Sequence, residues 1–93
     1  MAERLTLKPH QAVVFTELND GEGVLLHLES QFYYSLNPMG SYLWRLIESK
    51  EARDKPSLVN HLARVYSISK ERASSDVDEF LNNLKAESLL EIA

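Results

Sequence analysis

The sequence contains no cysteine, and this absence excludes several classes of protein. A disulfide framework, a thiolate metal site and a thiol redox motif all require cysteine. Cationic residues are also in the minority, with 10 lysines and arginines against 14 aspartates and glutamates, for a net charge of -4. Because nucleic-acid affinity comes largely from clustered cationic side chains, this composition disfavours a nucleic-acid partner.

Long apolar runs are missing as well. No segment approaches the roughly 20 apolar residues that span a bilayer, and the start, MAERLTLKPH, lacks the apolar core of a signal peptide. A chain of 93 residues with 44% apolar content suits one domain with one core. We therefore expect a single cytoplasmic domain over residues 1–93, with a flexible N-terminus at residues 1–10 and no membrane partner.

Motifs of known enzymes and metal sites are not found in the sequence. There is no His-Glu-x-x-His, no glycine-rich phosphate loop and no cysteine nucleophile. His10, His27 and His61 lack the spacing of metal ligands on a helix, and we expect each to be a surface residue. Asp76 and Asp78 point apart on a helix, which disfavours a shared acid–base site. The sequence therefore predicts a protein with no catalytic residue, no metal and no cofactor.

Three strand-like segments occupy residues 11–36. These are QAVVFTELN, GVLLHLES and FYYSL, separated by NDGEG and ESQ. Asn19, Asp20, Gly21 and Gly23 are residue types that suit the positive φ angles of a hairpin loop. Side chains alternate along the second segment. Leu26 and the residues two positions before and after it lie on one face, and the residues between them lie on the other. The pattern predicts a three-stranded antiparallel meander with one face on the core.

The hydrophobic period changes to that of helices after Leu36. Asn37 is a favourable N-cap, and Pro38 suits the first helical position because its missing N–H would have no partner there. Helices are expected at residues 38–49, at residues 57–66, and from a Ser69 cap to residue 87. The last residues, SLLEIA, form a short extension or strand. The order predicts an α+β domain, with three strands followed by three helices.

These segments resemble the PqqD-like family, whose members are also called RiPP recognition elements, over residues 11–92. The resemblance is carried by the Leu36-Asn37-Pro38 junction with Gly40 and Trp44, and by Asp76-Val77 with Phe80-Leu81 and Leu84. Free-standing members from lasso-peptide pathways are the most similar. The resemblance implies a winged-helix-like fold that binds a precursor's leader peptide as an extra strand on the third strand, against the third helix. It also implies a leader peptidase and an ATP-dependent cyclase as partners.

The candidate leader-binding residues lie on the expected third strand and third helix. They are Phe32, Tyr33, Tyr34, Ser35 and Leu36 on the strand, and Asp76, Val77, Phe80, Asn83 and Leu84 on the helix. Each has a structural alternative. Phe32, Tyr34 and Leu36 share one face and fit the core equally well, which leaves Tyr33 and Ser35 as exposed candidates. Phe80 and Leu84 also suit the core, and the charge of Asp76 is favourable near a helix N-terminus in any case.

Other functions remain compatible with the pattern. Three helices with a wing also suggest a winged helix-turn-helix DNA-binding regulator, although the third helix carries more acidic than basic residues. A peptide chaperone of another PqqD-type pathway is a second alternative. A dimer whose open sheet edges pair with each other is a third.

Overall fold

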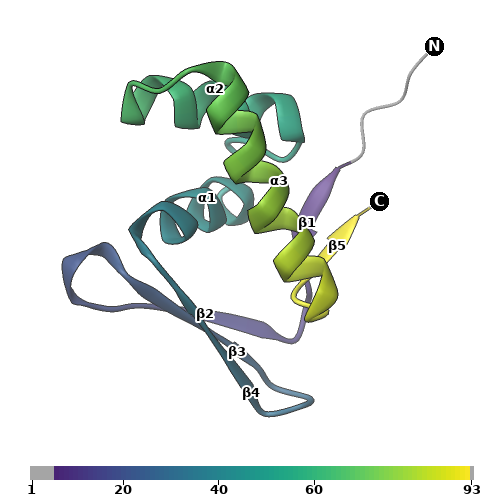
Figure 1. Cartoon of the computed structure of the whole chain (residues 1–93). Helices are drawn as coiled ribbons and strands as arrows, with labels where there is room; N and C mark the ends of the chain where they lie inside the picture. Colours follow the sequence, from purple (N-terminus) through teal and green to yellow (C-terminus); the bar gives the residue numbers. More distant parts are fainter. Residues whose placement is uncertain (1–5, 93) are drawn as a thin grey trace.

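The computed structural model describes residues 6–92, which form one sheet, a smaller strand pair and three helices (Figure 1). The elements are β1 (Leu7–Pro9), β2 (Val13–Glu17), the 3-10 turn η1 (Asn19–Gly21), β3 (Gly23–His27), β4 (Phe32–Leu36), α1 (Pro38–Glu48), α2 (Lys55–Tyr66), α3 (Lys70–Ala86) and β5 (Leu90–Ile92). This order confirms the predicted α+β class, with a three-stranded sheet followed by three helices. Among the described residues, no helix is long and apolar enough to cross a membrane.

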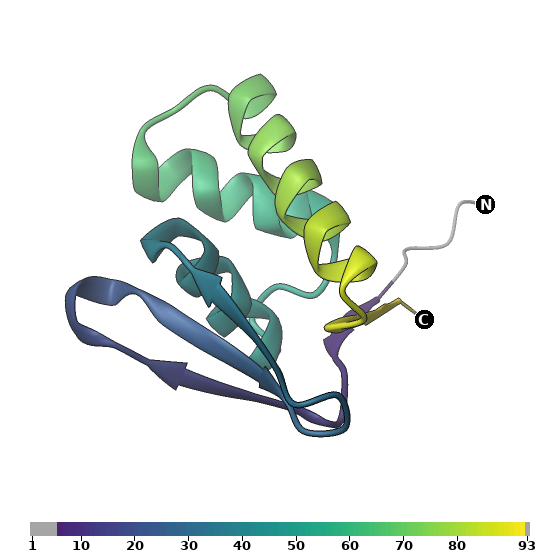
Figure 2. The same ribbon diagram turned by 60° about the horizontal axis from the view of Figure 1, so that its bottom comes forward.

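The main sheet is antiparallel with the strand order β2-β3-β4. All three helices lie on one side of it (Figures 1 and 2). On that side Leu25 of β3 and Leu36 of β4 are buried, and Phe15 and Tyr34 pack against the core. The opposite face carries the exposed side chain of Tyr33, among others. The sheet therefore has one covered face and one open face, as the alternation predicts.

The core is built where the helices meet the covered face of the sheet. Its fully buried members include Trp44, Leu43 and Ile47 from α1, Leu58 and Leu62 from α2, and Val77 and Leu84 from α3. Burying side chains of this size contributes about 1.5 to 3 kcal/mol each relative to leaving them exposed. These contacts fix α3 beside the sheet.

Side-chain caps fix the beginnings of the helices. The Asn37 side chain accepts the Gly40 N–H at 2.7 Å, and Pro38 follows as the first residue of α1. The N-cap of α3 is Ser69, as predicted. The second helix begins at Lys55, whereas the sequence predicts a start at residue 57. The Asp54 carboxylate accepts the Ser57 N–H at 2.9 Å, so the cap lies before a proline that the first turn tolerates.

The loop between β2 and β3 uses only part of the expected set of turn residues. Asp20 and Gly21 have positive φ angles of 64° and 81°. Gly23 has a different role, because a Cβ atom there would lie 2.4 Å from Cε1 of Phe15 and 2.7 Å from Oγ of Ser41. Glycine at 23 therefore makes room for the Phe15 ring on the covered face of the sheet.

The expected flexible N-terminus at residues 1–10 is in part a strand, and this corrects the prediction; residues 1–5 lie outside the described range. Strand β1 pairs antiparallel with β5 at the chain's other end. The Leu7 side chain is buried, and its N–H donates to the Arg53 carbonyl at 2.6 Å. The His10 N–H donates to the Leu89 carbonyl at 3.1 Å. These long-range bonds hold both ends of the chain against the domain.

We predict that Asn37→Ala lowers the free energy of unfolding by about 1 kcal/mol, because the Gly40 N–H loses its acceptor. Asn37→Ser keeps a side-chain acceptor at the cap and is expected to lose only a few tenths of that amount. Urea denaturation followed by far-UV circular dichroism measures both changes. Equal stability of the alanine and serine variants would contradict the capping role.

Candidate functional site

The outer edge of β4 carries free main-chain groups, as the hydrogen-bond pattern of the sheet shows. The Leu28 N–H donates to the Ala12 carbonyl at 2.8 Å, and the Leu18 N–H donates to the Glu22 carbonyl at 2.7 Å. Even-numbered residues of the β3 region therefore bond to the β2 side. Because antiparallel strands bond alternately to their two neighbours, the odd-numbered residues of β3 bond to β4.

The register then decides which β4 residues face the open edge. Odd-numbered residues 23, 25 and 27 of β3 pair with Leu36, Tyr34 and Phe32. Those three use their main chain within the sheet, so the main-chain groups of Tyr33 and Ser35 point away from it. No described strand occupies this edge, because β5 pairs with β1 and not with β4. Two N–H and two C=O groups are thus offered to a further strand.

A groove of about 310 Å³ lies between this edge and the helices; we call it the β4–α3 groove. Figure 2 shows β4 at the border of the sheet nearest α3. The strand and its junction contribute Tyr34, Ser35, Leu36 and Asn37, α1 contributes Met39, Gly40 and Leu43, and α3 contributes Arg72, Asp76, Glu79, Phe80 and Asn83. The groove therefore combines a main-chain edge, an apolar floor and a polar helical flank.

The structure brings six of the ten predicted site residues into this groove. They are Tyr34, Ser35, Leu36, Asp76, Phe80 and Asn83. Val77 and Leu84 are fully buried in the core behind it. Phe32 lines a separate depression at the start of β4, and the 67% exposed side chain of Tyr33 lies with Leu26 and Leu28 on the other face. Tyr33 does not line the β4–α3 groove, and only its main-chain groups lie at the free edge of β4.

Sequence reasoning missed several residues of the groove. Met39, Gly40 and Leu43 reach it from α1, which was treated as a core helix. Arg72 and Glu79 complete the flank of α3. Both residues lie three or four positions from Asp76 or Asn83. Helical spacing from these predicted site residues therefore identifies them as members of the same flank.

Opposite charges lie along the flank of α3. Nε of Arg72 is 4.0 Å from Oδ2 of Asp76, one helical turn away. Asp78 is directed elsewhere, because its carboxylate pairs with Nζ of Lys55 at 2.7 Å and links α3 to α2. The two aspartates therefore do not form a joint acid–base site. Asp76 and Glu79 against Arg72 leave the groove with one excess negative charge, which suits a ligand with a cationic or hydrogen-bond-donating group.

The prediction that every histidine lies at the surface is wrong for His27. Its side chain is only 6% exposed, at the end of β3 on the covered face. Its ring centroid lies 4.8 Å from that of His10. The strand alternation places His27 on the same face as Leu25, but the sequence does not show that the turn after β1 covers this position with a second histidine.

Comparisons with known proteins identify the family of the chain. The family model for Coenzyme PQQ synthesis protein D (PqqD) matches residues 22–90, from before β3 to the start of β5. The chain therefore belongs to the PqqD family, and the resemblance inferred from the sequence is confirmed. A search of curated proteins finds no match.

Two solved structures share the fold. One, described as TbiB1 in complex with the TbiA(beta) leader peptide, is 33% identical, with a TM-score of 0.80, over 90% of this chain and 94% of that chain. The other is a lasso peptide synthetase B1 complexed with the leader peptide, which is 16% identical, also with a TM-score of 0.80, over 92% and 98%. The second likeness bears on the fold alone. The first also supports membership of the family.

Proposed function

We propose that this protein is a non-catalytic recognition protein that binds the leader peptide of a ribosomally made precursor by strand addition to β4. The observation that carries the proposal is the open edge of β4, with the main chain of Tyr33 and Ser35 directed outward beside the groove. The relative with 33% identity is described in complex with a leader peptide. Addition of a strand to an exposed sheet edge is a general mode of peptide recognition.

Main-chain pairing alone does not give useful affinity. Four hydrogen bonds contribute about 2 to 6 kcal/mol net, whereas ordering four or five peptide residues costs ~1 to 2 kcal/mol for each. The two contributions nearly cancel. The affinity must therefore come from peptide side chains buried in the groove, at about 1.5 to 3 kcal/mol for a leucine-sized group.

The groove determines which side chains fit. Phe80, Met39 and Leu43 form its apolar floor, so we expect the leader to place at least one large apolar side chain there. Asp76 and Asn83 lie on the flank of α3 and accept or exchange hydrogen bonds with a neighbouring polar group of the peptide. Selectivity thus resides in the groove, and the strand edge supplies orientation.

We further propose that the bound precursor is presented to a leader peptidase and a cyclase of the same pathway. A peptide held along β4 is ordered only where it contacts the edge, so the segment beyond the strand stays available to an enzyme. The open outer face of the sheet beside β4 is left for such a partner.

One prediction of this proposal concerns the groove floor. Phe80→Ala is expected to weaken binding of a synthetic leader peptide at least tenfold, because the ring forms part of the apolar floor; the TbiA(beta) leader peptide, which the 33% identical relative binds, serves as the probe. Val65→Ala on α2 removes an exposed apolar side chain away from the groove and is the matched control. Fluorescence anisotropy with a labelled leader measures both. Equal affinity of the Phe80→Ala variant and the wild type would exclude the groove as the binding site.

Tyr33→Lys tests which face of the sheet the ligand uses. The Tyr33 side chain lies on the face away from the helices, so the same titration is expected to change less for this variant than for Phe80→Ala. A larger loss with Tyr33→Lys would instead place the peptide on the outer face.

Another prediction concerns the strand edge. Ser35→Pro removes an N–H that the sheet does not use, so the fold is expected to persist while leader binding falls at least tenfold. Ser35→Ala keeps the N–H and is expected to bind as the wild type does. Circular dichroism confirms folding before titration. A folded Ser35→Pro variant with unchanged affinity would show that the peptide does not pair with β4.

A further inference from the structure

Three side chains that could ligate a metal converge at the other end of β4. His10 lies in the turn after β1, His27 ends β3, and Glu29 lies in the turn that follows. One ligand atom from each lies within 4.8 Å of the others. The three side chains line one depression, together with Phe32 and Glu87. We call His10, His27 and Glu29 the histidine cluster.

The ring of His27 is buried, so the histidine cluster is not formed by exposed side chains alone. The His27 side chain is only 6% exposed, and its Nδ1 atom is buried. This atom has no hydrogen-bond partner among the described residues. An unpartnered polar atom is unfavourable in the interior, and native proteins usually pair such atoms. A metal ion that binds a nitrogen of the His27 ring would change the hydrogen-bonding state of Nδ1.

We propose that the histidine cluster binds one divalent transition-metal ion, with Zn²⁺ as the reference ion. Two imidazoles and one carboxylate form a donor set that zinc accepts, at about 2.0 to 2.2 Å from each ligand atom. At such bond lengths tetrahedral ligands lie about 3.3 Å apart, so no pair of ligand atoms has to approach by more than roughly 1.5 Å. Glu29 is exposed and free to make that movement. A fourth position remains for water or for the Glu87 carboxylate.

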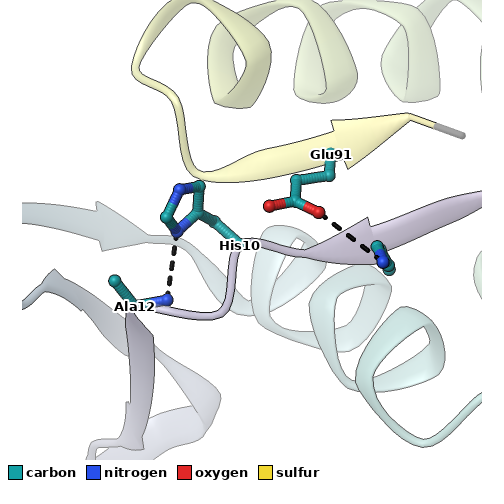
Figure 3. Close-up of polar contacts among 4 residues, drawn as sticks. His10, Ala12 and Glu91 are labelled. Atoms are coloured by element: carbon teal, nitrogen blue, oxygen red, sulfur yellow. Dashed lines mark hydrogen bonds and ion pairs between the residues drawn. The ribbon is translucent and has the colours of Figure 1, made fainter.

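Metal binding by His10 requires the ring to give up its present hydrogen bond. Nδ1 of His10 accepts the Ala12 N–H at 3.0 Å, as Figure 3 shows, so the neutral ring carries its proton on Nε2. A metal must either displace Ala12 from Nδ1 or bind Nε2 after that proton moves and the ring turns. Either route breaks the bond to Ala12.

This proposal differs from the sequence-based expectation of no metal site, and it is independent of the proposed leader binding. That expectation used spacing along a helix, whereas the cluster is formed by two turns and a strand end. The β1–β5 pair holds the turn in place. The His10 N–H donates to the Leu89 carbonyl, and Glu91 of β5, labelled in Figure 3, forms an ion pair with Lys8 of β1.

Isothermal titration of the tag-free wild-type protein with ZnCl₂ at pH 7.5 tests the proposal. We expect one site, with at least tenfold weaker binding for Glu29→Gln and for His10→Gln. His61→Gln on α2 and Glu22→Gln before β3 remove one residue of each type elsewhere and are expected to bind as the wild type does. MgCl₂ is expected not to bind. Absence of binding at 50 μM protein, or an equal loss in the control variants, would overturn the site.

A measurement on the unmodified chain guards against misfolded variants. In ¹H–¹⁵N spectra, added Zn²⁺ is expected to shift the Ala12 amide and the ring signals of His10 and His27, while the His61 ring signals stay in place. Co²⁺ in place of Zn²⁺ is expected to give visible absorption bands of a four-coordinate ion. Shifts at His61 of the same size as those at His10, or at neither residue, would show adventitious binding or none.

Discussion

The alternation of main-chain hydrogen bonds across the sheet is the constraint on which the proposed site depends. Because β3 uses its even-numbered residues toward β2, β4 must bond to β3 through Phe32, Tyr34 and Leu36. The same alternation turns the side chains of Tyr34 and Leu36 toward the helices. It leaves the main chain of Tyr33 and Ser35 at the free edge. A shift of one residue in this register would bury the wrong side chains and close the groove.

Two features of the chain keep that edge open. The junction at Asn37 turns β4 directly into α1, so no following strand can return alongside β4. The last strand, β5, pairs with β1 on another part of the domain. There the Leu7 side chain is buried, and its N–H donates to the loop after α1. An exposed edge is normally a risk for aggregation. Here it is short, and α3 flanks it.

The local elements could be predicted from the sequence, whereas the long-range pairings could not. The start of α1 at Asn37 and Pro38 and the N-cap of α3 at Ser69 depend on residues that are close together in the sequence. The β1–β5 pair joins two three-residue strands from opposite ends of the chain, too short to show a period. His27 illustrates the same limit, because alternation gives its face but only the fold shows that His10 covers it. The residues from α1 were missed in the groove for the same reason.

Main chain and side chains contribute different properties to recognition. The free groups of β4 depend only on backbone geometry, which the two solved structures share with this chain although most of their side chains differ. Such an edge cannot distinguish one peptide sequence from another, because every peptide offers the same partners. In the proposed mode of binding, discrimination comes from side chains that line the groove, such as Phe80, Arg72 and Asp76. The buried Val77 and Leu84 anchor α3 in the core, so the flank that lines the groove is held in place by contacts that do not themselves line it.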